Sequence, residues 1–237
     1  MAKLKGRLFL LPSPIVENGL ESISPEVIRI LHSLDFFIVE RARTARRFIS
    51  ATKPSKVIDL LTIEEIPEKA LTSNEIELLL QPALDGHDMG LMSEAGLPAI
   101  ADPGQLYVSA AQKLGIKIVP LSGPSSIMMA LMASGLEGQR FAFHGYLSAK
   151  KDELPGQLKE LEKKADRDDA TQIWIETPYR NGQILQAVEK HLDQNRNFCI
   201  AAGLGSEDGM VITKKIMEWK KSGWPEIHKV PTVFLLK

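Results

Sequence analysis

The sequence lacks most of the features that would place it in a specialised class of protein. It has one cysteine, Cys199, so it cannot form an internal disulfide or a metal site built on several cysteines. No apolar run approaches the roughly 20 residues of a transmembrane helix, and residues 1–6 lack a signal-peptide pattern. The net charge of −1 over 237 residues gives no global attraction to nucleic acid or membrane. We therefore expect a cytoplasmic protein in which any polyanion site is a local patch.

Several signatures of catalysis are also missing. The chain has no Walker phosphate loop, no Gly-x-Gly-x-x-Gly and no Gly-x-Ser-x-Gly. Its histidines are scattered without the spacing of metal ligands, so we predict no metal site; they are His32, His87, His144, His191 and His228. A site with few reactive side chains favours group transfer from a preactivated donor, because alignment and desolvation then do most of the work.

The first half of the chain alternates short apolar runs with helical patterns. We predict strands over residues 7–11, 36–39, 57–60, 88–92 and 116–121. Helices are predicted to open at Ser24 and to cover 76–84, capped by Thr72 or Ser73, and 106–114, with an exposed acidic loop over 62–69. Such alternation implies a mainly parallel sheet with right-handed crossovers.

The second half has strands with fewer crossovers. We predict strands over 141–146, 172–176, 198–202 and 230–236, helices over 127–133, 150–169 and 182–191, and a helix or partial strand over 210–221. The helix over 127–133 is apolar on every side, which predicts burial at the centre of the molecule. The fold class is therefore α/β, with two α/β domains: residues 1–121, with a mainly parallel sheet, and residues 122–237.

The most informative stretch covers residues 90–104. It starts as a buried strand and breaks into a loop with two glycines, two prolines and two acids, Glu94 and Asp102. Ligands of open α/β sheets bind at the carboxyl ends of strands, so this loop predicts a small-molecule site; an ordinary strand-to-helix turn is the alternative. A similar loop at 121–126 favours the site, although Ser125 or Ser126 could simply cap the helix that follows.

Four arginines, Arg41, Arg43, Arg46 and Arg47, follow the predicted strand at 36–39. They form either a solvated helix face or a patch that contacts phosphate at the mouth of the site. The absence of lysine among them slightly favours the phosphate-contacting patch, since the guanidinium fork suits phosphate.

These loops resemble those of the tetrapyrrole methylase superfamily. Ser-Glu-Ala-Gly-Leu-Pro at 93–98 with Asp-Pro-Gly at 102–104 resembles the family's Ser-Asp-Ala-Gly-Thr-Pro…Asp-Pro-Gly, and the segment at 119–125 resembles Val-Pro-Leu-Pro-Gly-Pro-Ser. Pro-Ser-Pro-Ile at 12–15, Glu-Arg-Ala-Arg at 40–43 and Glu-Thr-Pro-Tyr-Arg at 176–180 are similar to segments of the ribosomal RNA small-subunit methyltransferase I group, which methylates a cytidine 2′-hydroxyl. The resemblance covers nearly the whole chain.

The resemblance implies two α/β domains with S-adenosylmethionine in the cleft between them, usually in a homodimer. Carried over residue by residue, the predicted donor site comprises Ser93, Glu94, Ala95, Gly96, Ile100, Asp102, Pro103 and Gly104; Leu121, Ser122, Gly123, Ser125 and Ser126; Trp174, Ile175 and Glu176; and Ala201 and Ala202.

The leading hypothesis is a methyltransferase that uses this donor on RNA of the small ribosomal subunit. A hydroxyl acceptor needs a general base nearby. Glu40, Glu94 and Glu176 are the candidates, and each could instead hold a loop by accepting backbone hydrogen bonds. The predicted RNA-phosphate ligands are Arg41, Arg43, Arg46, Arg47 and Arg180.

Two departures from the group keep the acceptor open. Arg41-Ala42 replaces an Asp-Thr pair, and residues 201–206 lack three charged residues present in the group's Ala-Arg-Glu-Leu-Thr-Lys. The alternatives are a methyltransferase for a porphyrinoid or other small molecule, and a protein that binds the donor without transferring its methyl group. The loop at 12–15 disfavours a porphyrinoid acceptor, because porphyrin enzymes usually carry Gly-x-Gly-Pro-Gly at this place.

Overall fold

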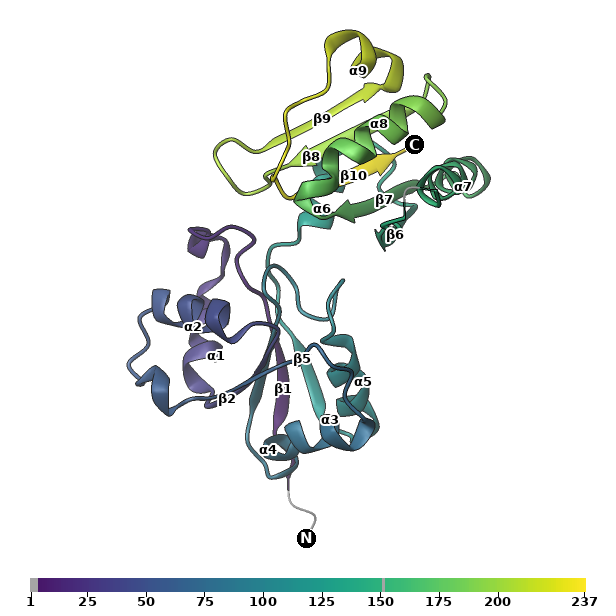
Figure 1. The fold of residues 1–237 in the computed structure, drawn as a ribbon. Helices are drawn as coiled ribbons and strands as arrows, with labels where there is room; N and C mark the ends of the chain where they lie inside the picture. Colours follow the sequence, from purple (N-terminus) through teal and green to yellow (C-terminus); the bar gives the residue numbers. More distant parts are fainter. Residues whose placement is uncertain (1–3, 151) are drawn as a thin grey trace. The chain divides into compact units, whose positions relative to one another are not determined.

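The computed structural model describes residues 4–150 and 152–237. The chain divides into two compact units, Met1–Ser125 and Ser126–Lys237, and each unit is built on one five-stranded sheet (Figure 1). Each sheet has helices packed on both of its faces, so both units are α/β.

The first unit carries an entirely parallel sheet. Its strands are β1 (Arg7–Leu11), β2 (Phe36–Val39), β3 (Thr62–Glu65), β4 (Met89–Met92) and β5 (Lys117–Pro120). Its helices are α1 (Pro25–Ser33), α2 (Ala42–Ala51), α3 (Ser73–Leu79), α4 (Gln81–Leu84) and α5 (Gln105–Lys113), with 3-10 turns at Leu20–Ser22 and Ile58–Leu60. The strand order is β3-β2-β4-β1-β5 and every pair is parallel, which confirms the predicted sheet type.

Local sequence signals account for the helix starts in this unit. The Ser24 hydroxyl accepts a hydrogen bond from the Val27 N–H, and Pro25 occupies the first helical position. Thr72 and Glu75 form a reciprocal capping box at the start of α3. Both predicted starts are confirmed.

Alternation along the strands assigns the two faces of the parallel sheet. Phe37 and Val39 pack with α1 and α2, whereas Ile38 between them packs with α3 and α5. The strand β1 leads into α1 on the first face, and its neighbour β4 leads into α5 on the other. Chain connections thus leave β1 and β4 toward opposite faces, which creates a crevice at their carboxyl ends, the place where open α/β sheets bind ligands.

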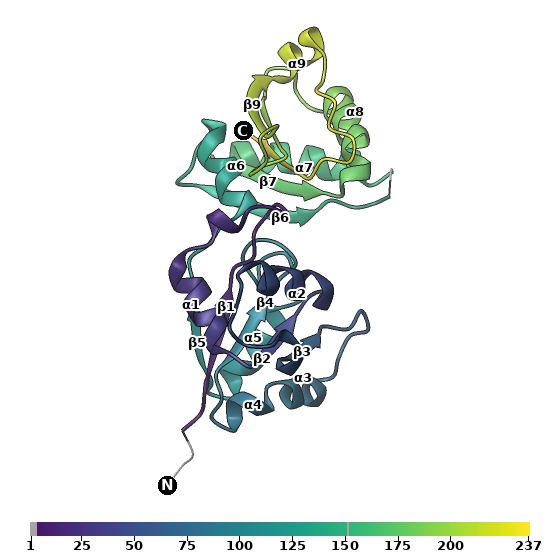
Figure 2. The ribbon, with the colours of Figure 1, turned by 90° about the vertical axis from the view of Figure 1, so that its left-hand side faces the viewer.

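The second unit carries a mixed sheet in the order β6-β7-β10-β8-β9. Among the described strands only β6 and β7, seen side by side in Figure 2, pair in parallel. Its strands are β6 (Phe141–Tyr146), β7 (Thr171–Glu176), β8 (Asn197–Ala202), β9 (Met210–Lys215) and β10 (Thr232–Leu236). Its helices are α6 (Ser126–Ser134), α7 (Leu154–Arg167), α8 (Asn181–His191) and α9 (Ile216–Ser222), with a 3-10 turn at Pro178–Arg180.

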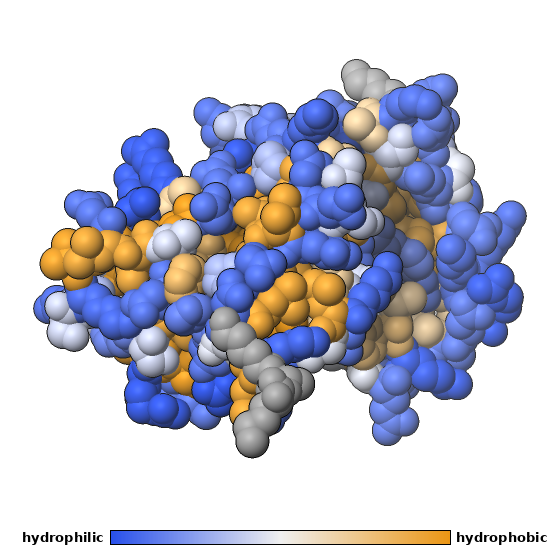
Figure 3. Space-filling view, turned by 90° about the horizontal axis from the view of Figure 1, so that it is seen from below, coloured by the Kyte–Doolittle hydropathy of each residue, from blue (hydrophilic) through white to orange (hydrophobic). Residues whose placement is uncertain are grey.

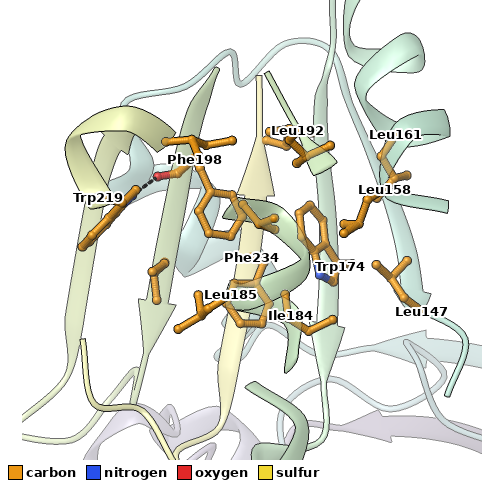
Figure 4. Packing of buried hydrophobic residues seen from close by; sticks show 14 of the residues in the cluster. Leu147, Leu158, Leu161, Trp174, Ile184, Leu185, Leu192, Phe198, Trp219 and Phe234 are labelled. Atoms are coloured by element: carbon orange, nitrogen blue, oxygen red, sulfur yellow. Dashed lines mark hydrogen bonds between the residues drawn. The ribbon is translucent and has the colours of Figure 1, made fainter. Parts of the chain in front are cut away.

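Aromatic rings form the centre of the second unit's core (Figure 4). The Trp174 ring centroid lies 5.7 Å from that of Phe234 and 5.9 Å from that of Phe198. The Trp219 indole N–H donates to the Phe198 carbonyl oxygen at 2.9 Å. Helices α7, α8 and α9 cover this face of the sheet, and α6 packs against the other face.

Three predictions about the first unit were wrong. Residues 57–60 were expected to form a short strand, but Ile58–Leu60 is a 3-10 turn and Leu60 is 80% exposed. The strand lies instead at Thr62–Glu65, where an acidic loop was predicted; it is the edge strand next to β2, and charged side chains suit an edge. The predicted helix over 76–84 is split at Leu80, since Pro82 cannot continue the hydrogen-bond ladder of α3.

The expectation that α6 is buried on all sides was also wrong. Ile127, Ala130 and Leu131 are buried against the sheet, but Met132 is 83% exposed. A helix that packs on one face of a sheet buries only the side that touches the sheet, even when its opposite side is also apolar. Residues 210–221 do combine a strand with a helix, as predicted.

Hydrophobic side chains reach the surface in separate patches among hydrophilic ones on the face shown in Figure 3. Single exposed apolar residues are ordinary on a folded protein. Within residues 4–150 and 152–237, no helix combines the length and apolar character needed to cross a bilayer.

Candidate functional site

The loops that follow β1 and β4 are joined by backbone hydrogen bonds. Ser13 N–H donates to the Gly96 carbonyl at 2.8 Å, and Gly96 N–H donates back to the Ser13 carbonyl at 3.0 Å. The buried Ser13 hydroxyl donates to the Ser93 carbonyl at 2.9 Å. These bonds fix the loop that begins at Ser93 at the crevice between β1 and β4.

Two glycines allow three loops to meet at this edge. Gly96 has a φ of +75°, in the left-handed region that favours glycine. A Cβ atom on Gly123, in the loop after β5, would lie 2.1 Å from Pro12 Cβ, in the loop after β1. The glycine at 123 is therefore required by close packing of the protein against itself.

Asp102 organises the second half of the loop after β4. Its Oδ1 accepts hydrogen bonds from the N–H groups of Ala99 at 3.0 Å and Gly104 at 2.7 Å. Its Oδ2 is buried without a hydrogen-bond partner among the described residues, and burial raises the pKa of this carboxyl above its usual value. Ala99 and Ala101 have φ of 66° and 62°, and Ile100 between them is 48% exposed. Such strain in non-glycine residues concentrates at functional sites.

Two of the three predicted base candidates lie beside this loop. Glu94 N–H donates to Glu40 Oε2 at 2.8 Å, and the Thr44 hydroxyl, from α2, donates to Glu94 Oε1 at 3.3 Å. The charge of Glu40 is a lesser cause of the raised pKa of Asp102. Three carboxylates are therefore gathered at one edge of the first unit, and residues 12–24, 93–104 and 121–126 contain no lysine or arginine to offset them.

The third base candidate, Glu176, is an internal ion-pair partner in the second unit. Its Oε1 accepts from Thr177 N–H at 2.7 Å, and its Oε2 lies 3.2 Å from Arg180 Nη1 without hydrogen-bond geometry. Arg180 also donates through Nη2 to the Ser148 carbonyl at 2.7 Å. The Arg180 side chain is only 19% exposed, so it is held within its unit, unlike the other four predicted RNA ligands.

The remaining donor-site residues of the second unit lie at the carboxyl ends of β7 and β8. The Trp174 side chain is fully buried in the aromatic core, and Ala201 and Ala202 are also buried. Ile175 is half-buried on the face covered by α6. Because the Trp174 side chain is buried in the core, Trp174 could contact a ligand only through its backbone.

The four arginines on and next to α2 are exposed to solvent, and three of them face carboxylates. The pairs are Arg41 with Glu65 and Glu68 at 3.4 Å, Arg46 with Asp59 at 3.6 Å and Arg47 with Glu17 at 3.6 Å. Arg43 has no carboxylate partner within residues 4–150 and 152–237. Exposed pairs at such distances contribute little to stability, so these guanidinium groups can exchange their partners for phosphate at small cost.

A cavity of about 560 Å³ opens beside Glu94. Its walls come from the loop after β1, from α2, and from Glu94 and Ala95. Thr44 and Phe48 also line it and were not predicted as site residues. Their spacing on α2 is that of one helix face, but nothing in the sequence places that face against Glu94.

A second cavity, of about 670 Å³, lies at the opposite, amino end of the same sheet. Its main charged groups neutralise each other, since Arg7 binds Asp88 through Nη2 at 2.5 Å, which holds the pKa of Asp88 below its usual value. In the part of the chain that the structure describes, no group of three or more His, Cys, Asp or Glu is placed to hold a metal ion.

Comparison with known proteins assigns the family. The chain belongs to the Tetrapyrrole (Corrin/Porphyrin) Methylases, whose family model matches residues 18–219. It is 32% identical over 197 residues to a protein of Vibrio cholerae named ribosomal RNA small subunit methyltransferase I, a match that covers 83% of this chain and 64% of that protein. For the protein of the same name from Escherichia coli O157:H7, the identity is 28%, over 98% of this chain and 71% of the relative.

Solved structures show the same fold. The methyltransferase CobJ aligns over 98% of this chain and 93% of its own with a TM-score of 0.63 and 16% identity. A diphthine synthase aligns over 97% and 88% with a TM-score of 0.64 and 17% identity. At these identities the likeness concerns the fold alone. The chain spans about two thirds of the length of the two curated relatives named above.

Proposed function

We propose that this chain is an S-adenosylmethionine-dependent methyltransferase that acts on RNA of the small ribosomal subunit, at the ribose 2′-oxygen of a cytidine. One observation carries the proposal: Glu94 and Asp102, from the loop after β4, lie with Glu40, at the end of β2, at the ligand-binding edge of the parallel sheet, and the interlocked loops after β1, β4 and β5 contain no basic residue. The names of the two curated relatives support ribosomal RNA as the acceptor.

The residues present fit the proposed donor. The donor carries an ammonium and a sulfonium charge, and three carboxylates beside loops that contain no lysine or arginine complement those charges, whereas they would repel a phosphate cofactor. The buried, unpartnered Oδ2 of Asp102 offers an acceptor for a ligand's N–H or O–H group. A uroporphyrin-III C-methyltransferase of this fold, from Thermus thermophilus, was solved with S-adenyl homocysteine. When bound, the donor would supply an activated methyl group.

The protein's own contribution is to bind, align and take up a proton. Residues 93–104 and 121–126 would hold the donor, since the strained turn around Ile100 and the close-packed Gly123 form a rigid surface. The deprotonating group must reach the acceptor hydroxyl. Glu176 faces Arg180 and Thr177, and Glu40 accepts the Glu94 N–H and does not line the cavity of about 560 Å³, whereas Glu94 lines it. Glu94 is therefore the base best placed in the first unit.

The arginines on and next to α2 would supply the RNA-phosphate contacts. Arg41, Arg46 and Arg47 can leave their exposed carboxylate partners for a phosphate. The loss of one phosphate contact reduces the steepness of log affinity against log salt by about one. Arg180, held by Glu176 and the Ser148 carbonyl, is the weaker candidate for such a contact. Homodimer formation stays a prediction from the family resemblance, and a cytoplasmic location stays a prediction from the composition of the sequence.

The test is transfer of a radiolabelled methyl group from S-adenosylmethionine to small ribosomal subunits taken from a strain that lacks the gene. Label in the RNA, mapped to a ribose 2′-oxygen of a cytidine, is the expected result. If the RNA stays unlabelled and an extract of the same strain yields a labelled porphyrinoid, the acceptor is a small molecule instead. Donor binding without any labelled product would make the chain a binding protein.

A further inference from the structure

The cavity of about 560 Å³ between the loop after β1 and α2 is a built feature of the first unit alone. Ile15, Val16, Leu20 and Phe48 give it apolar walls, and the same residues or their neighbours pack into the core beneath it. Ser13, fixed by hydrogen bonds to the loop after β4, closes one side of it. It is thus held open by packed elements, as ligand pockets usually are.

Polar groups are confined to one wall and to the mouth. Glu94 lines the cavity, and its carboxylate accepts the Thr44 hydroxyl hydrogen at Oε1. Arg47 and Glu17 also line it and face each other at 3.6 Å, with side chains 63% and 85% exposed. A cavity with apolar walls, the Glu94 carboxylate on one side and an arginine at its mouth matches a ligand with a flat ring, a hydroxyl group and a phosphate.

We propose that this cavity holds one unstacked nucleoside of the RNA acceptor, with its ribose hydroxyl against Glu94, its base between the apolar walls and its phosphate at Arg47. This inference rests on the proposed function. The hydroxyl proton passes to the Glu94 carboxylate, the oxygen lone pair forms the new bond to the methyl carbon, and the carbon–sulfur bonding pair returns to the donor's sulfur. Atoms that sit within a paired helix cannot reach such a chamber, so the nucleotide must be extruded or lie in a single strand.

The position of the cavity distinguishes it from the proposed donor site. Of the predicted donor residues, only Glu94 and Ala95 line it; residues 100–104 and 121–126 do not. Acceptor and donor surfaces therefore meet at Glu94, which is the arrangement that in-line attack on the methyl group requires. Thr44 is a positioning residue, because it acts only through its hydrogen bond to Glu94.

The volume of about 560 Å³ lies within the roughly 300–1,000 Å³ range of small-molecule pockets.

The experiment fills the cavity without disturbing the core. Ala51 is exposed at the end of α2 and lines the cavity, and its neighbour Ser50 is exposed but does not line it. We compare Ala51→Trp with Ser50→Trp as the matched control, in the full chain, by donor calorimetry, by binding of a short single-stranded RNA that contains cytidine, and by methyl transfer to small ribosomal subunits. Ala51→Trp is expected to weaken RNA binding and transfer at least tenfold with donor affinity unchanged, and Ser50→Trp to change neither.

Loss of donor affinity in Ala51→Trp would overturn the inference, because the cavity would then belong to the donor. Equal RNA binding in both variants would also overturn it. If the wild type binds RNA through the cavity but methylates nothing, the proposed function fails while the cavity assignment stands.

Three further variants test the proton acceptor. Glu94→Gln is expected to lower the maximal rate by about 10²–10⁴-fold and to remove the acidic limb of the pH–rate profile, with RNA affinity kept. Thr44→Val should produce a smaller loss that Thr44→Ser restores. An unchanged pH profile in Glu94→Gln would show that Glu94 does not take the proton.

Discussion

Replacement of Gly123 by alanine tests the interlocking of the loops. The new Cβ would lie 2.1 Å from Pro12 Cβ and 2.5 Å from Pro12 Cγ. A proline ring cannot turn aside as a flexible side chain does, so the loop after β1 must move. Overpacking of this kind costs about 1–3 kcal/mol, and contact distances this short place the expected cost near the upper value. For a unit of this size, about 3 kcal/mol corresponds to a melting temperature lower by about 10 °C.

The assay combines a thermal melt with donor calorimetry. Gly138→Ala is the control, because a Cβ there meets no atom within 4 Å and the backbone is not left-handed. Donor affinity should fall in Gly123→Ala at temperatures where the fold is intact. The new side chain displaces Pro12, and the loop that moves with Pro12 carries Ser13, which anchors Gly96. A melting temperature within about 2 °C of wild type, with normal donor binding, would refute the argument that these loops are closely packed.

Three further outcomes follow from buried groups. Asn181→Ala should destabilise the protein by about 2–4 kcal/mol in urea titrations, because its amide donates to the buried Ile227 and Val230 carbonyls at 2.8 Å each; a loss under about 1 kcal/mol would contradict this. Burial raises the pKa of Asp102 above 3.8, so its contribution to the free energy of unfolding is present below pH 3.8 and is lost as the pH rises through the raised pKa. Asp102→Asn should therefore make the free energy of unfolding depend less on pH over that window; an unchanged dependence on pH would count against this. Burial raises the pKa of Cys199 to about 11, so a maleimide at pH 8 should label it only as the second unit unfolds; rapid labelling of the native protein would refute its burial.

Much of the fold could be predicted because local signals and burial agree. Ser24 and Thr72 are strong capping residues, and the runs at β1, β2 and β4 are apolar on both faces, as parallel strands must be. The strand at Thr62–Glu65 could not be predicted, because an edge strand with acidic side chains looks like a loop. The exposure of Met132 could not be predicted either, since it depends on what packs against α6.

The candidate site could be predicted as a set of loops but not as a set of contacts. Gly96 and Asp102 are visible as turn residues, whereas the pairing of Ser13 with Gly96 and of Thr44 with Glu94 joins residues far apart in the chain. Glu176 and Arg180 are four residues apart, and that spacing was the one available signal of their ion pair.

The most direct test of the central claim is isothermal titration of the protein with S-adenosylmethionine. If the carboxylate-rich loops at the edge of the parallel sheet hold the donor, the wild type gives saturable one-site binding that Asp102→Ala weakens at least tenfold. The absence of any binding by the folded wild-type protein would contradict the assignment of these loops.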